Sequence, residues 1–390
     1  MSRVRAVAVR VLRDAERGRR FVDDVLDEAR QEALSSRDRA FLTHVVYGVT
    51  RHRRTLDHLL RKISGVHDFD SQVLQTLRIG LYEIHFLRTA PHAAVDEAVE
   101  LAKGVSRKSG NFVNAVLRKA IAADREKLIG ADWGVRYSYP TWLVERWKRI
   151  YGDRTVSILE AGNAILPITA RVNRLRTAPL RFPRGHRPES VVLDGPIGEL
   201  PELREGLVTV QDETAMWVAP LVDPEGKHII DLCASPGGKA THLAELRGRV
   251  VAVDLSLEKI RLVRESAQRL GLTISLVVAD GRHFAGRFDA ALVDAPCSNT
   301  GVLARRADAR WRLREIEIAS AVGIQQSLLE NAATLAPRIV YSTCSIEPEE
   351  NEERVDEFLA SHRGWTCDHR ELILPGPTAA GGFAARLIRS

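Results

Sequence analysis

Apolar residues recur at every third or fourth position through the first third of the chain. The repeat is clearest in four stretches, at residues 4–15, 38–51, 72–87 and 111–123. Such spacing places the apolar side chains on one face of a helix, and the "SSRD" of residues 35–38 is a typical helix start. Because this region shows little strand-like alternation and no internal repeat, residues 1–125 are predicted to form an all-α domain of about five to seven helices.

The middle of the chain, residues 126–225, has no long periodic stretch and is interrupted by prolines. Short apolar runs at residues 168–175 and 190–195 predict two strands. We expect a small connecting subdomain here.

Strand-like and helix-like runs alternate from residue 226 to the C-terminus. Strands are predicted at residues 228–234, 249–256, 274–280, 288–296 and 338–345, and helices at 237–247, 257–271, 312–335 and 348–362. This alternation is typical of a Rossmann-like α/β domain, in which helices cover both faces of a parallel sheet. Ligands of such sheets bind beyond the carboxyl ends of the strands. The predicted domains are therefore 1–125, 126–225 and 226–390.

Positive charge is concentrated in the first part of the chain. Residues 1–150 carry 28 Lys and Arg against 19 Asp and Glu, whereas residues 151–390 carry 29 against 32. A basic helical part beside a mildly acidic part suggests a polyanion-binding module joined to a second function. A solvated helical surface that happens to be basic gives the same count, so charge alone leaves nucleic-acid binding open.

Composition narrows the class of protein further. No apolar run approaches the roughly 18 residues of a membrane-spanning helix, and the N-terminus predicts a basic amphipathic helix and no signal peptide. We therefore expect a cytoplasmic location without a membrane partner. We also expect a monomer, although the sequence does not fix the oligomeric state. The cysteines form no CxxC pair and no histidine cluster lies at ligand spacing, which argues against a metal site. They are Cys233, Cys297, Cys344 and Cys367, too widely spaced for a disulfide framework.

A glycine turn follows the first strand of the predicted sheet. Gly237 and Gly238 let a ligand approach the backbone closely, and the following helix offers free amide donors. The turn is neither GxGxxG nor a P-loop. Asp254, Asp280 and Asp294 end the next three strands, where carboxylates accept hydrogen bonds from ribose hydroxyls or a base amino group. The pattern indicates a nucleoside cofactor, although each aspartate by itself is also a typical helix cap.

Two cysteines stand in matching turns, just beyond the fourth and fifth strands. Cys297 lies in "DAPCSNTG" and Cys344 in "YSTCS". Neighbouring strands are about 4.8 Å apart, so both sulfurs should face the cleft that the glycine turn borders. A thiolate that adds to C6 of a pyrimidine makes C5 nucleophilic enough to take a methyl group. Asp294 would stabilise the ring, and the second thiol would help to release the product.

Five ordered motifs carry a resemblance to a known family. They are "DLCASPGGK", "VVAVDLS", "VVADGRHF", "DAPCSNTG" and "YSTCSIEPEENE". Together with "VQDETA", "DARW", "PHAAVDEAVELAK" and "FVNAVLRK", they closely resemble the bacterial 16S rRNA cytosine-C5 methyltransferases of the NOL1/NOP2/Sun family, the group with an N-terminal domain like the antitermination factor NusB. The resemblance covers nearly the whole chain. It implies a NusB-like helical domain, a connecting subdomain and a Rossmann-like methyltransferase domain.

The resemblance also implies a cofactor, a substrate and residue roles. The implied methyl donor is S-adenosylmethionine, and the implied substrate is an unpaired cytosine of 16S rRNA, because the chemistry cannot reach a stacked base. Cys344 is implied to be the nucleophile and Cys297 to assist product release. The implied cofactor-binding residues are Cys233, Ala234, Ser235, Pro236, Gly237, Gly238, Lys239, Asp254, Asp280 and Asp294.

Basic residues directly after the Cys297 turn are candidates for RNA contact. Arg305, Arg306, Arg310 and Arg312 are suited to phosphate, and Trp311 to stacking on a base. The expected substrate-binding residues are Asp294, Arg310 and Trp311. Trp311 also fits a core position at the start of the long helix.

The sequence departs from the family pattern at several positions. Asn299 stands where Gly or Ala is frequent, and asparagine tolerates left-handed backbone. Ala304 and Ala307 replace a common Arg and Pro before "DARW", and Ala380 replaces the acid of "DGFF". We expect none of these changes to touch the two thiols.

Other functions fit parts of the pattern. An RNA-binding factor with a decayed catalytic domain would not need both cysteines and all three aspartates. A DNA cytosine-C5 methyltransferase uses the cysteine after Pro in the fourth-strand turn and lacks the one in "STCS". A tRNA substrate stays open because related enzymes share the catalytic motifs, but the helical first domain favours rRNA.

Overall fold

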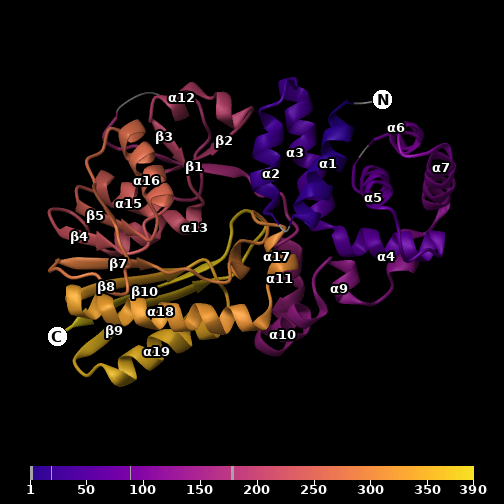
Figure 1. Cartoon of the computed structure of the whole chain (residues 1–390). Coiled ribbons are helices and arrows are strands. Elements are labelled where there is room, and N and C mark those ends of the chain that lie inside the picture. The colour runs from indigo at the N-terminus through magenta and orange to yellow at the C-terminus, as the bar shows by residue number, and fades with distance from the viewer. Residues whose placement is uncertain (1–2, 19, 88, 177–179) are drawn as a thin grey trace. The chain divides into compact units, whose positions relative to one another are not determined.

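The computed structural model describes residues 3–18, 20–87, 89–176 and 180–390. They belong to two compact units, Met1–Leu159 and Glu160–Ser390 (Figure 1). The finer division at residues 125 and 225 stays a prediction. No helix in the described ranges is both long and apolar enough to cross a membrane.

The first unit is built from helices. They are α1 (Arg3–Arg17), α2 (Val22–Arg30), α3 (Ser36–Arg51), α4 (Arg53–Ser64), α5 (Ser71–His85), α6 (Pro91–Lys103), α7 (Arg107–Ala122), α8 (Arg125–Ile129), α9 (Trp133–Arg136) and α10 (Thr141–Tyr151), then the 3-10 turn η1 (Gly152–Arg154) and α11 (Thr155–Ala161). Polar caps fix several starts. Ser35 accepts a hydrogen bond from the Asp38 amide (3.1 Å), which confirms the predicted start of α3, and Asp70 caps α5.

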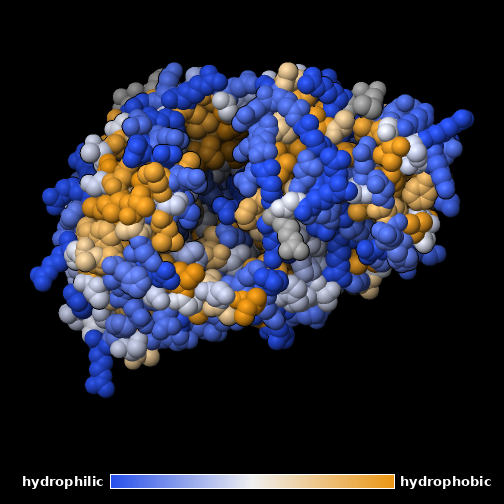
Figure 2. All heavy atoms as spheres, in the orientation of Figure 1, coloured by the Kyte–Doolittle hydropathy of each residue, from blue (hydrophilic) through white to orange (hydrophobic). Residues whose placement is uncertain are grey.

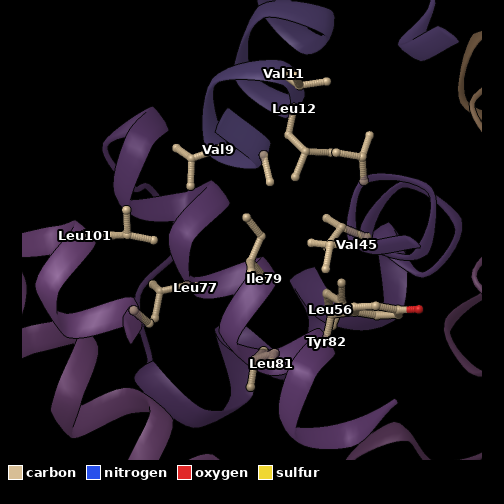
Figure 3. Packing of buried hydrophobic residues seen from close by; sticks show 14 of the residues in the cluster. Val9, Val11, Leu12, Val45, Leu56, Leu77, Ile79, Leu81, Tyr82 and Leu101 are labelled. Carbon is tan, nitrogen blue, oxygen red and sulfur yellow. The ribbon is translucent and has the colours of Figure 1, made fainter. Parts of the chain in front are cut away.

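Apolar faces of these helices meet in one core. Figure 3 shows Leu77 and Ile79 of α5 among Val9 and Leu12 of α1, Val45 of α3 and Leu56 of α4. Some arginines of this unit lie inside it in ion pairs with acidic residues. Arg78, almost fully buried, binds Asp57 (2.7 Å) and Glu16 (2.9 Å), and Arg5 binds Glu83 (2.8 Å).

The second unit begins with a small antiparallel sheet in the order β2-β1-β3. Its strands are β1 (Ile168–Val172), β2 (Ser190–Leu193) and β3 (Val208–Val210), and η2 (Ile197–Glu199), α12 (Pro201–Arg204), α13 (Glu213–Met216) and α14 (Val218–Leu221) lie between and after them in the chain. The predictions of β1 and β2 are confirmed. β3 was not predicted, because three residues are too few to show a period.

A larger sheet of seven strands has the order β6-β5-β4-β7-β8-β10-β9. Its strands are β4 (His228–Asp231), β5 (Arg249–Asp254), β6 (Ser275–Val278), β7 (Ala290–Asp294), β8 (Arg338–Thr343), β9 (Trp365–Ile373) and β10 (Gly382–Arg389). The first five are parallel, as predicted. β9 and β10 were not predicted, and β10 is antiparallel to both β8 and β9.

Helices cover both faces of the larger sheet (Figure 1). Besides α12 to α14, the second unit contains α15 (Gly238–Glu245), α16 (Leu257–Leu270), α17 (Ala309–Arg312), α18 (Glu315–Leu335) and α19 (Glu352–Ser361), with 3-10 turns η3 (Thr300–Val302) and η4 (Pro348–Glu350). α18 and α19 pack on one face, where Leu328 and Phe358 meet Val293 and Tyr341. α14, α15 and α16 pack on the other. The strand order reverses between β4 and β7, which predicts a ligand site at that edge.

Candidate active site

The turn between β4 and α15 is shaped for close approach of a ligand. Gly237 has φ +109°, a conformation that favours glycine, and a Cβ there would lie 3.1 Å from Cα of Val263. Gly238 begins α15, so backbone amides at this helix start point into the turn. Asp254 ends the neighbouring β5, and its carboxylate accepts hydrogen bonds from the amides of Ser235 (3.1 Å) and Leu255 (2.8 Å).

A buried carboxyl group that the sequence analysis missed lies under this turn. Asp231 is fully buried, and one of its oxygens accepts from the Cys233 amide (3.3 Å) while the other has no partner among the described residues. Burial and the nearby Asp294 charge raise the pKa of Asp231 to about 8. The sequence could have pointed to this residue, because Asp231 is the first residue of the motif "DLCASPGGK".

These surroundings fit S-adenosylmethionine. Its sulfonium and ammonium groups are cationic, and Asp231, Asp254 and Asp294 act on one another electrostatically at the strand ends. Beside Asp254, Leu255 and Leu257 are 63% and 49% exposed, an apolar surface suited to a purine. Figure 2 shows hydrophobic surface over the part of the second unit that carries β5 and α16. Cys233 packs into the core below the turn.

Asp280 lies two residues after β6, near the position that the pattern predicts. Its carboxylate binds the Arg282 guanidinium (2.6 Å) and the Arg282 amide (2.9 Å). The hydrogen bonds from Arg282 lower the pKa of Asp280 to about 2. If the amino group of a cofactor's nucleobase bound Asp280, it would therefore share the carboxylate with Arg282.

The two turns that carry Cys297 and Cys344 meet at the same edge. β7 and β8 are neighbouring parallel strands, with Asp294 in register with Ser342. The sulfur atoms of Cys297 and Cys344 lie 3.1 Å apart, and both side chains are partly exposed. Each turn is followed by a short 3-10 segment, η3 or η4. In the described part of the chain, no long helix therefore begins directly at either sulfur.

Charged groups distinguish the two thiols. The pKa of Cys344 is lowered, mainly by the hydrogen bond from Cys297. The positive charges of Lys239 and Arg306 lower this pKa further, whereas burial and the Asp294 charge raise it. The same bond, with burial, raises the pKa of Cys297. Lys239 donates to Asp294 (2.7 Å), whose other oxygen accepts from Ser342 (2.9 Å). Lys239, expected at the cofactor, thus also acts on the proposed nucleophile.

Asn299 touches both cysteine residues. It adopts the left-handed conformation, with φ +62°, as its tolerance of that region predicts. Its amide nitrogen donates to the Cys297 carbonyl (2.8 Å), and its Oδ1 lies 3.2 Å from the Cys344 sulfur, which donates to it as a thiol. The expectation that no departure from the family pattern reaches the thiols is therefore wrong.

A pocket of about 330 Å³, including its open mouth, has Cys344 in its lining. Its walls come from α13, α15, the β8 turn and the start of β10, and its lining includes Asp212, Thr214, Trp217, Lys239, Cys344 and Phe383. The Asp212 carboxylate is held by Arg305 (3.1 Å).

Arg310 does not fit its predicted role in RNA binding. The side chain is fully buried, and its guanidinium donates to Oδ1 of Asn163 (2.8 Å) and to the Gly162 carbonyl (2.7 Å). These contacts hold the segment after the Cys297 turn in place, so phosphate cannot reach the group in this conformation. Trp311 is partly exposed. Arg306 is exposed and donates to Asn299 (3.4 Å).

Two of the other departures from the family pattern lie side by side. Ala304 and Ala380, both buried, pack with Leu166 in one apolar cluster. An arginine at the first position and an acid at the second would occupy this same place. With alanine at both positions, this cluster of described residues contains no charged side chain. Ala307 is also buried.

Comparisons with known proteins agree with this architecture. Residues 216–382 match the family described as 16S rRNA methyltransferase RsmB/F, residues 2–122 match the NusB family, and residues 139–181 match the ferredoxin-like domain of RsmF/B-like methyltransferases. These matches confirm the predicted NusB-like, connecting and methyltransferase parts.

Similar proteins cover most of the chain. A probable ribosomal RNA small subunit methyltransferase B of Synechocystis sp. is 34% identical over 96% of this chain and 93% of its own. The ribosomal RNA small subunit methyltransferase B of Shigella sonnei is 35% identical over 84% of this chain and 83% of its own.

Solved structures share the fold. PH0851 has a TM-score of 0.81 at 24% identity and covers 100% of this chain and 99% of its own. A methyltransferase homologue protein of Pyrococcus horikoshii has a TM-score of 0.57 at 27% identity and covers 66% of this chain and 97% of its own. The chain therefore belongs to the RsmB/F family of 16S rRNA methyltransferases, which depend on S-adenosylmethionine.

Proposed function

We propose that this methyltransferase modifies C5 of an unpaired cytosine in 16S rRNA through a covalent bond between Cys344 and C6 of the base. The observation that carries the proposal is the 3.1 Å separation of the two sulfurs beside Lys239 and Asp294. One thiol is needed as a nucleophile and a second group as a base. The site offers both within contact distance of each other.

The glycine turn and the strand ends are the proposed cofactor site. Residues 233–239, with Asp254 and Asp280, would hold the nucleoside and amino-acid parts, and Asp231 and Asp294 lie where positive charge is favoured. The cofactor supplies an electrophilic methyl group, which C5 takes up. Side chains of the protein carry out the other steps.

In the first step, the Cys344 thiolate bonds to C6, and the electron pair of the C5–C6 double bond passes toward C5 and the ring nitrogen. As a thiolate, Cys344 accepts the Cys297 proton in a hydrogen bond, and Lys239 stabilises its charge. Asp294 borders this sulfur and is suited to hold the ring nitrogen or amino group, with Lys239 and Ser342 fixing its position.

In the second step, Cys297 removes the proton from C5. The bond to Cys344 is the main cause of the raised pKa at Cys297, and the Cys344 charge adds to it. Neither this hydrogen bond nor the negative charge of Cys344 remains once the Cys344 sulfur is bonded to carbon. The Cys297 proton is then lost to water more easily, and the Cys297 thiolate is the proposed base. Removal of the C5 proton re-forms the double bond, and Cys344 leaves as a thiolate.

The substrate assignment rests on the family and on the site. Relatives are named for the small subunit ribosomal RNA, and the pocket beside Cys344 would take a base that has left its stack. Arg306, exposed next to Asn299, is a better candidate for phosphate contact than the buried Arg310.

The test is methyl transfer from labelled cofactor to unmodified 16S rRNA fragments, with product nucleosides separated and covalent protein–RNA complexes resolved under denaturing conditions. Wild type should label C5 of cytosine. Cys344→Ala should be inactive and form no complex, whereas Cys297→Ala should accumulate one. Cys367→Ala is the matched control, because its sulfur lies on β9 and donates to the His369 carbonyl, and it should behave as wild type.

Two outcomes contradict the proposal. Exchange of the phenotypes of the two variants would mean that the roles of the sulfurs are reversed. Label on the ribose or on an exocyclic nitrogen would exclude an adduct at C6, since those positions need no thiol addition. A tRNA that is methylated faster than the 16S fragments would overturn the substrate assignment.

A further inference from the structure

A buried carboxyl group that the mechanism above does not use lies beneath both cysteine turns. Glu350 is the last residue of η4 and is fully buried. The sequence predicted that the acidic run after Glu347 begins a helix. Glu352 and Glu353 do lie in the first turn of α19, but Glu350 precedes that helix and points into the protein.

One oxygen of Glu350 binds the turn that carries Cys297. Oε1 accepts from the Ser298 amide (2.9 Å) and from Nε2 of Gln325 (3.0 Å). Gln325, buried on α18, also donates to the Pro296 carbonyl (3.0 Å). The residues on both sides of Cys297 are therefore tied to one carboxylate.

The other oxygen of Glu350 binds the turn that carries Cys344. Oε2 accepts from the hydroxyls of Ser345 and Ser298, the residues directly after the two cysteines. The backbone of this element is fixed as well, because the Tyr341 hydroxyl donates to the Glu350 carbonyl (2.6 Å). One side chain thus bridges two turns that belong to different strands.

We propose that Glu350 is a positioning residue that holds the two thiols in contact and assigns their different roles. The inference rests on the proposed function, since it concerns the same two sulfurs. Four donors, two of them N–H groups, converge on the carboxyl group, which is the pattern of an ionised carboxylate. Its negative charge lies below Cys297, whereas the Lys239 cation lies beside Cys344.

This arrangement of charges separates the two sulfurs chemically. A carboxylate near Cys297 disfavours a second anion there, so Cys297 keeps its proton and donates it to Cys344. Burial raises the pKa of Glu350, while the bonds from Ser298 and Ser345 oppose that effect. Loss of the charge alone should therefore make the two thiols more alike, even where the fold is unchanged.

The decisive variant is Glu350→Gln. Glutamine keeps the shape, its oxygen can accept from Ser298 and Gln325, and its amide can donate to the two hydroxyls, which also act as acceptors. A backbone bond from Gly301 to the Cys344 carbonyl (2.9 Å) remains to link the turns. The matched control is Glu353→Gln, the same change at an exposed position of α19. Glu350→Ala removes the bridge itself.

The experiment measures alkylation of each cysteine by iodoacetamide, without RNA, by peptide mass spectrometry. In wild type and Glu353→Gln, Cys344 should react faster than Cys297. In Glu350→Gln, the ratio of the two rates should fall by about ten-fold. In RNA methylation, Glu350→Gln should lower kcat with KM unchanged, because Cys297 then supports the Cys344 thiolate less well.

A Glu350→Gln enzyme with the wild-type alkylation ratio and kcat would overturn the proposal, and Glu350 would then be structural only. Thermal unfolding shows whether Glu350→Ala still folds. If it does not, Glu350→Gln decides whether Glu350 positions the thiols. If Cys297→Ala forms no covalent complex with RNA, the proposed function fails, but the alkylation ratio still tests Glu350.

Discussion

The Cys344 sulfur lies 3.2 Å from Oδ1 of Asn299. This oxygen accepts the proton of Cys344 when the residue is a thiol, which stabilises the uncharged form. Asn299→Gly removes the acceptor and suits the φ of +62°. We expect the pKa of Cys344 to fall and its alkylation at neutral pH to become about five-fold faster.

The opposite change supplies the control for that prediction. Asn299→Asp places a carboxylate at the same distance from the sulfur and should slow the alkylation of Cys344. Alkylation of Cys367, in the same samples, should not change. Equal rates in Asn299→Gly and wild type would show that Asn299 does not influence the nucleophile.

Mild oxidation should join the two sulfurs. Diamide takes up two hydrogen atoms as two thiols become a disulfide, and Cys297 and Cys344 are already in contact. We expect reversible loss of methyltransferase activity, restored by dithiothreitol, and a cross-linked peptide pair in the mass spectrum. Cys297→Ala should give no such pair, and Cys367→Ala should give it as wild type does. A dominant cross-link that involves Cys233 would contradict the geometry.

The Ala304 and Ala380 positions should show coupled energetics. Ala380→Asp places a carboxylate in the apolar cluster around Leu166 and should lower the free energy of unfolding by about 3 kcal/mol, because the charge is unpaired. Adding Ala304→Arg supplies a cation in the same cluster and should recover more than half of this loss. A double-mutant cycle in urea measures the coupling. Strictly additive effects would mean that the two side chains do not meet.

His242 should make the protein less stable in acid. Burial, with the nearby Arg171 charge, lowers the pKa of this histidine to about 2. Below pH about 6.5 the unfolded chain therefore binds one more proton than the folded one, so the free energy of unfolding falls as pH falls, by about 1.4 kcal/mol per pH unit. The loss continues until the pH approaches the folded-state pKa.

The measurement is urea unfolding of the full chain at several pH values between 6.5 and 4.5. His242→Gln cannot take up the proton, so its dependence should be shallower than wild type by about one proton. His283→Gln, at an exposed position, serves as control and should keep the wild-type slope. Parallel curves for wild type and His242→Gln would contradict the assignment.

Local pattern was sufficient for the layout of the α/β domain. The alternation of short apolar runs and amphipathic helices fixes five parallel strands, since each strand must be covered on both faces. β9 and β10 were not predicted because they follow the last predicted helix as an antiparallel pair, outside the alternation of strand and helix. β10 is buried between β8 and β9, and its "GFAARLIR" has little of the β-branched character that indicates a strand.

By itself, the sequence determined that Cys297 and Cys344 lie at the same edge of the sheet, because parallel strands present their carboxyl ends at one edge. Only the tertiary structure decided which charged residues contact the cysteine turns at that edge. Arg310 looked like an RNA contact and is buried, whereas Glu350 looked like a helix start and bridges both cysteine turns. The reason is physical: a charged side chain is buried only where distant segments supply its partners, and the local sequence does not show which segments those are.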